Sequence, residues 1–123
     1  MSFIHYLFLG HFERDSHGVR FSKSPSDPAY RPVVSRPIDS AAITAVLRAV
    51  RGAGDVDLAL PDDWMIWMKD GYLACEKYTR DREALAFVTR LVERTHCEIY
   101  DVSARADMSL RDWLAVTRSY AKP

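Results

Sequence analysis

The chain has 123 residues, a length typical of one folded domain, and its 48% hydrophobic and 28% charged residues exclude a disordered or fibrous protein. Seventeen basic residues balance seventeen acidic ones, so the overall charge offers no general attraction for nucleic acid or an anionic membrane. No stretch approaches the roughly 20 apolar residues of a membrane-spanning helix. We therefore expect a single domain over residues 1–123, with neither nucleic acid nor a membrane as partner.

Residues 3–12 (FIHYLFLGHF) are apolar on both alternating faces, which is typical of a strand covered on both sides. No basic segment precedes this run and no small-residue cleavage site follows it, so we do not interpret it as a secretory signal, and we expect a cytoplasmic protein. The polar turn ERDSHG and the short run VRFS then predict a β-hairpin.

Residues 22–37 (SKSPSDPAYRPVVSRP) contain four prolines. Proline lacks a backbone N–H and fixes φ, so neither a helix nor a central strand can run through this segment. We expect a proline-rich loop, which is long for a small domain; such loops are usually either functional or disordered, and both alternatives stay open.

A first helix is predicted to begin at Asp39 or Ser40, because either side chain can accept a free backbone N–H at the helix start. Ile38 and Ile43 occupy the positions of a hydrophobic staple. Gly52 and Gly54 are expected to end the helix. DVDLAL, residues 55–60, alternates like a strand.

A hairpin is predicted where WMIWMK and YLACEKY flank Asp70 and Gly71, since this dipeptide suits a type I′ turn with two positive φ angles. Trp64 and Trp67 differ in parity, so they should face opposite sides of the sheet. The side chain outside the helix-covered core must then lie on the second face.

A second helix is expected over 81–95, with an inner stripe of Ala84, Leu85, Val88, Leu91 and Val92. CEIYDV should form another strand. Ser109 and Asp112 make a short capping box, which starts a third helix at about Leu110.

These elements predict an α+β fold with three helices on a mostly antiparallel sheet. Without the first return strand and one strand of the central group, the order is β-α-β-β-α-β. That series is the order of ferredoxin-like, split βαβ folds, here with an extra hairpin.

The histidines and cysteines are the candidate metal ligands and disulfide partners of the chain. His5, His11 and His17 could approach one another, but they lack the spacing of zinc ligands, so we expect no metal. Cys75 and Cys97 are interpreted as buried, reduced thiols; a disulfide would require their strands to be neighbours.

No glycine-rich phosphate loop or nucleophile elbow is present in the sequence, and we expect no cofactor. The remaining catalytic alternative is a small hydrolase or isomerase that pairs His5 or His11 with an aspartate of the central strands. Whether the chain is an enzyme stays open, and the lack of a catalytic motif favours a binding protein.

Large rings and carboxylates concentrate around the central hairpin. An exposed tryptophan or tyrosine is a typical anchor of a protein interface, and acidic side chains suit a basic partner. The candidate partner-binding residues are Trp64, Trp67, Tyr72, Asp62 and Asp63. Self-association that buries the second sheet face, with or without a small ligand, is a further alternative.

Residues 71–102 contain a strand with a cysteine, a helix of the type A-L-x-F-V-x-x-L-V and a strand that ends C-x-I-Y-D. This segment, about a quarter of the chain, resembles part of the small α+β immunity proteins that bacteria encode beside polymorphic or contact-dependent toxins. The resemblance implies a protein that binds and neutralises a cognate toxin without catalysing a reaction. The resemblance does not identify any toxin-contacting residue in this sequence.

Overall fold

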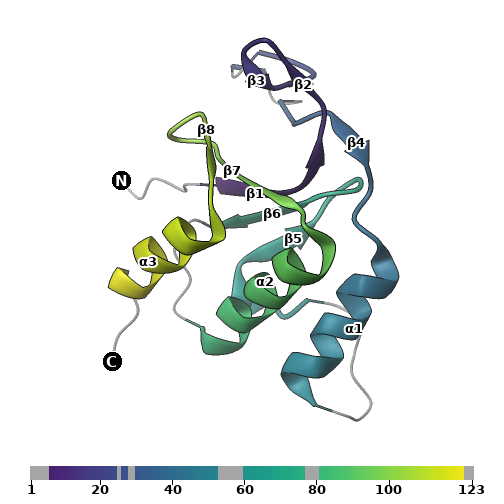
Figure 1. Ribbon diagram of the computed structural model, residues 1–123, viewed down its shortest axis with the longest axis vertical. Coiled ribbons are helices and arrows are strands. Elements are labelled where there is room, and N and C mark those ends of the chain that lie inside the picture. The colour runs from purple at the N-terminus through teal and green to yellow at the C-terminus, as the bar shows by residue number, and fades with distance from the viewer. Residues whose placement is uncertain (1–5, 25, 28–29, 53–59, 77–80, 121–123) are drawn as a thin grey trace.

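The computed structural model describes residues 6–24, 26–27, 30–52, 60–76 and 81–120. These residues form an α+β structure with three α-helices, which confirms the predicted class (Figure 1). The helices are α1 (Ser40–Arg51), α2 (Arg82–Thr95) and α3 (Leu110–Tyr120). No helix among the described residues is long and apolar enough to cross a membrane.

The main sheet is antiparallel in every pair and has the order β5-β6-β1-β7-β8. A sixth strand, β4, pairs with the end of β1. The strands are β1 (Tyr6–Phe12), β4 (Val34–Arg36), β5 (Ile66–Met68), β6 (Leu73–Glu76), β7 (Glu98–Asp101) and β8 (Ala106–Met108). A separate two-stranded hairpin joins β2 (Arg14–Asp15) to β3 (Gly18–Val19).

Strand β1 is central and is buried on both faces, as its sequence predicted. Leu7 and Leu9 point into the core beneath α1 and α2, which lie side by side on one face of the sheet (Figure 1). Phe8 and Phe12 point to the opposite face and form a second apolar cluster with Tyr72, Ala74, Tyr100 and Val19. The sheet therefore separates two cores.

All three predicted helix starts are confirmed by their caps. The Asp39 carboxylate accepts the N–H of Ala41 at 3.0 Å, and the Asp81 carboxylate accepts the N–H groups of Glu83 and Ala84. The Ser109 hydroxyl accepts the N–H of Asp112 at 3.1 Å. The helices thus begin where short side chains satisfy the first free donors. Phe87, which the predicted stripe of α2 left out, is fully buried.

The N-terminal half differs from prediction in how its strands pair. The run after the turn returns against Arg14 and Asp15 rather than along residues 3–12. The end of β1 pairs instead with β4, inside the proline-rich segment, through His11 with Arg36 and Phe12 with Val34. Residues 33–36 contain no proline, so this short stretch can donate to a sheet edge.

Two further strands were not placed correctly by the sequence. β8 was missed because it has only three residues, two of them exposed, and its pairing with β7 is visible only in the fold. β5 begins at Ile66, later than predicted, because a 3-10 turn, η1 (Asp62–Trp64), and a left-handed Met65 come before it. The predicted strand 55–60 lies outside the described residues, apart from Leu60.

The hairpin around Asp70 and Gly71 is confirmed, but its turn is not type I′. Gly71 has a φ of +83°, whereas Asp70 is not among the residues with positive φ. The N–H of Lys69 donates to the carbonyl of Tyr72 at 2.8 Å, and the carbonyl of Gly71 accepts the N–H of Ile38 at 3.1 Å. This last bond ties the turn to the start of α1.

Candidate functional site

The sheet face opposite the helices carries a row of side chains from neighbouring strands. The antiparallel register places Trp67 of β5 beside Ala74 of β6, Ala74 beside Phe8 of β1, and Phe8 beside Tyr100 of β7. Residues paired in this way point to the same face. Ala74 is the smallest of the four, so the row is hollow between Trp67 and Phe8.

The chain covers one half of this face with its own residues 20–24, 26–27 and 30–33, which we call the covering segment. Its two arms are joined by backbone hydrogen bonds from Val33 to Arg20 at 2.8 Å and from Ser22 to Arg31 at 3.0 Å. The ring of Phe21 lies 5.2 Å from that of Tyr100 and stacks on Tyr30 at 4.6 Å. The covering segment therefore lies over the β1 and β7 part of the face.

An ion-pair network holds the adjacent hairpin against the far edge of the sheet. The Arg14 guanidinium binds the carboxylates of Glu98 on β7 and Asp107 on β8. Hydrogen bonds from the guanidinium to both carboxylates raise the pKa of Arg14. Glu98 also accepts the N–H of Phe12 at 3.0 Å, at the irregularity in β1 where the strand leaves the sheet. These bonds attach the β2–β3 hairpin, which leads into the covering segment, to the β7 and β8 edge of the sheet.

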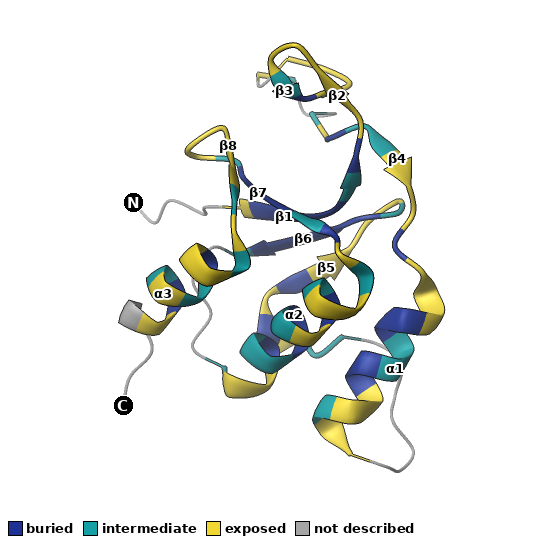
Figure 2. Ribbon diagram, viewed as in Figure 1, coloured by how far each residue is buried: buried dark blue, intermediate teal, exposed yellow. Residues whose placement is uncertain are grey.

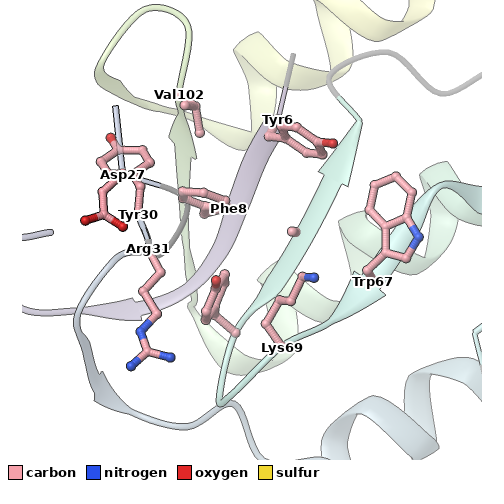
Figure 3. Close-up of a pocket in the computed structure, with 10 residues that line it drawn as sticks. Tyr6, Phe8, Asp27, Tyr30, Arg31, Trp67, Lys69 and Val102 are labelled. Atoms are coloured by element: carbon pink, nitrogen blue, oxygen red, sulfur yellow. The ribbon is translucent and has the colours of Figure 1, made fainter. Parts of the chain in front are cut away.

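The uncovered half of the face forms a concave pocket of about 610 Å³. This volume is within the usual range for small-molecule sites, roughly 300–1,000 Å³. Side chains from β1, β5, β6 and the covering segment surround it (Figure 3). The lining residues are Tyr6, Phe8, Asp27, Tyr30, Arg31, Trp67, Lys69, Tyr72, Ala74 and Val102.

The pocket combines aromatic rings with two cations. Trp67 meets Tyr6 edge-on at 6.1 Å, and Tyr72 meets Phe8 edge-on at 5.4 Å. Burial raises the pKa of both Tyr72 and Tyr30, so these phenols stay neutral and keep their O–H donors. The pocket can thus pack a flat ring and hydrogen-bond a polar group.

The structure brings together only some of the predicted partner-binding residues. Trp67 and Tyr72 line the same pocket, and Trp67 is 36% exposed. Trp64, in contrast, is 2% exposed and packs against Phe87 beneath the helices. The two tryptophans lie on opposite faces, as expected, although Trp64 lies in η1 and not in a strand that continues to Trp67. Trp64 is part of the core, and we remove it from the contact surface. Asp62 and Asp63 are exposed in η1, at the start of the hairpin.

Sequence reasoning missed the other residues of the pocket. Phe8 and Tyr6 share their parity on β1, and this pattern could have identified them as members of the second face. Tyr30 and Arg31 gave no signal, because only the folding of the covering segment brings them to the sheet. Lys69 ends the strand-like run WMIWMK in the sequence, and nothing in that pattern indicated a binding role.

No histidine is placed for the predicted acid–base pairing among the described residues. His11 is half-buried, and burial, with the nearby Arg36, lowers its pKa. It makes no hydrogen bond to a described carboxylate. His17 and His96 are exposed, and His5 lies outside the described residues. No group of three or more His, Cys, Asp or Glu side chains in this part of the chain is arranged to hold a metal.

Both cysteines are free and buried. β6, which carries Cys75, and β7, which Cys97 precedes, lie on opposite sides of β1, so the strands are not neighbours. Burial raises the pKa of Cys75 to about 12 and also raises that of Cys97. Neither thiol is activated as a nucleophile.

Comparison with known protein families, curated proteins and solved structures finds no match to this chain. The function of the protein is therefore inferred from the chemistry and geometry of its own surface.

Proposed function

We propose that this protein is a small binding protein that acts as an immunity-type inhibitor, docking on a cognate bacterial toxin through the edge of its sheet at β5. The observation that carries the proposal is the exposure of three large apolar side chains in and beside this edge strand. Met65, Trp67 and Met68 lie within four residues of one another, and Met68 is 53% exposed. Figure 2 shows exposed positions in and around β5. Single exposed apolar residues are ordinary, whereas adjacent ones are typical of an interaction surface.

The position of β5 supports this surface. β5 ends the order of the described strands, so its outer side faces away from β6. An edge strand offers backbone donors and acceptors to a partner, while the protruding tryptophan and methionines supply apolar contact area. Methionine adapts its shape to a partner because its side chain is flexible and polarisable.

The charge beside this edge indicates the kind of partner. Asp62 and Asp63 are exposed, and neither forms an ion pair with a described residue. Two free carboxylates next to an apolar cluster complement a basic protein surface and speed its association. The resemblance of residues 71–102 to immunity proteins supports the same class of partner.

As the finer description of the fold, we propose a ferredoxin-like split βαβ core. The elements β1, α1, β5, β6, α2 and β7 follow one another along the chain, apart from the insertion of the β2–β3 hairpin and β4. β6 and β7 flank β1, and β5 lies beyond β6. This arrangement assigns α1 and α2 to one face and leaves an edge and the second face for binding. We place this activity in the cytoplasm, where the free thiols of Cys75 and Cys97 would stay reduced.

Co-expression with the product of the neighbouring open reading frame tests the function. We expect a stable complex and suppression of that product's toxicity. Met68→Asp and Asp63→Lys should each weaken the complex at least about tenfold, since each places an unpaired charge or a repulsion in the interface. Ala49→Asp, at an exposed position of α1, is the matched control and should bind normally.

Two results would refute the proposal: a neighbour that is not toxic and forms no complex, or a complex that Met68→Asp leaves intact. Self-association through the same edge is the alternative that the exposed strand also favours. A dimeric mass in sedimentation at low micromolar concentration, lost in Met68→Asp, would identify it.

A further inference from the structure

We propose that the pocket between β5 and the covering segment binds a small molecule that carries one flat ring system and one anionic group. This site goes beyond the proposed toxin contact: it shares Trp67 with that contact, but its other lining residues do not include Met65, Met68, Asp62 or Asp63.

The shape of the pocket results from one small residue among large ones. Ala74 forms the floor, between Phe8 on one strand and Trp67 on the other. Any larger side chain at this position would extend into the hollow. Since the covering segment closes only the far side, a flat ring can enter beside Trp67 and rest on Ala74.

The walls are suited to an aromatic ligand. In Figure 3 Trp67 and Lys69 rise on one side, Tyr30 and Arg31 lie on the other, and Phe8 lies between them. Aromatic rings prefer edge-on or offset contacts with one another, and the pairs of Tyr6 with Trp67 and of Phe8 with Tyr72 are already edge-on. A ligand ring can make the same kind of contact with these side chains.

The charged residues that line the pocket complement a ligand with one negative charge. Arg31 and Lys69 oppose the single carboxylate of Asp27, so the lining carries one excess positive charge. Lys69 forms no ion pair with a described residue. Among the described residues Arg31 forms an ion pair with Asp70, at 3.8 Å, and the Asp70 side chain is 97% exposed, so this pair holds the guanidinium weakly. Both cations are therefore available to an anion.

A single small ligand fits these features better than a nucleic-acid strand. A strand requires a track of cations and several stacking platforms in succession. Here the described lining provides two cations and one hollow, and the chain as a whole has no net charge.

The test uses 8-anilino-1-naphthalenesulfonate as the anionic ring probe and N-phenyl-1-naphthylamine as its uncharged counterpart, titrated by fluorescence at low salt. We expect one site for the sulfonate, with binding at least about fivefold tighter than that of the uncharged probe. Lys69→Gln should weaken sulfonate binding about tenfold, as the loss of a charge-assisted contact does. Ala74→Leu should abolish binding by filling the floor.

Met68→Gln is the matched control, because Met68 adjoins Lys69 but does not line the pocket. It should bind the sulfonate normally even if it loses a protein partner. Near-ultraviolet circular dichroism checks that Ala74→Leu keeps its fold, and Lys69→Gln, at an exposed position, tests the site without altering the core.

The proposal is overturned if both variants bind the sulfonate like the wild type, or if the uncharged probe binds equally well. It is also overturned if a ten-residue deoxythymidine oligonucleotide binds more tightly than the sulfonate and loses affinity in Lys69→Gln, since the site would then be one for single-stranded nucleic acid.

Discussion

The ring of Phe21 should hold the covering segment on the sheet, and Phe21→Ala tests this. The ring is partly buried and lies within 6.4 Å of Phe8, 5.2 Å of Tyr100 and 4.6 Å of Tyr30. Each aromatic pair contributes about 0.5–1.5 kcal/mol beyond area burial, and a buried phenylalanine about 1.5–3 kcal/mol from transfer alone. Because Phe21 keeps some exposure, we expect a loss of about 2–3 kcal/mol, below the range of about 3–5 kcal/mol for a fully buried ring.

Urea unfolding followed by circular dichroism measures this loss. With a slope of about 1–3 kcal/mol per molar urea for a small protein, the midpoint should fall by about 0.7–3 M. Phe21→Leu should recover roughly half of the difference, since it restores apolar volume but no ring contact. Met68→Ala, at an exposed position, should unfold near the wild-type midpoint.

Phe21→Ala should also weaken binding of the anionic probe in the pocket. Tyr30 and Arg31 belong to the covering segment, so its release removes one wall and one cation. A Phe21→Ala protein that unfolds at the wild-type urea concentration, or that binds the anionic probe unchanged, would show that the segment is not held by this ring.

Three other predictions concern single groups. Cys75 should resist a thiol reagent at pH 8 until the protein unfolds, because burial raises the pKa of its thiol to about 12. The unfolded thiol ionises near pH 9, so the free energy of unfolding should fall as the pH rises above 9. This fall should be less steep in Cys75→Ala. Burial and the nearby Arg36 lower the pKa of His11, so the folded state favours the neutral imidazole. The free energy of unfolding should therefore fall as the pH drops below about 6.5, and His11→Gln should flatten this dependence. Titration of the imidazole by NMR should show the lowered pKa. Gly71→Ala should lower the free energy of unfolding in urea by about 1–2 kcal/mol, because Gly71 has a φ of +83° and the new Cβ would lie 3.3 Å from Pro37. An unchanged urea midpoint would contradict backbone strain at this position.

The helices could be predicted because their signals are local. Asp39, Asp81 and Ser109 each cap a helix through a backbone N–H two or three residues away. The apolar stripe of each helix also follows from its own periodicity. The double burial of β1 was readable in the same way, from side chains that alternate along one strand.

The strand pairings and the pocket could not be predicted. Arg14 reaches Glu98 across 84 positions of the chain, and β4 pairs with β1 from within a segment whose prolines predicted a loop. Tyr30 and Arg31 line the same pocket as Trp67 because the covering segment folds back over the sheet.

The sequence by itself determined the helices, the two-sided central strand and the opposite directions of Trp64 and Trp67, because these depend on residues a few positions apart. Tertiary structure alone decided which tryptophan became core and which half of the second face stayed open. Those outcomes depend on contacts between segments far apart in the chain, whose geometry no local pattern encodes.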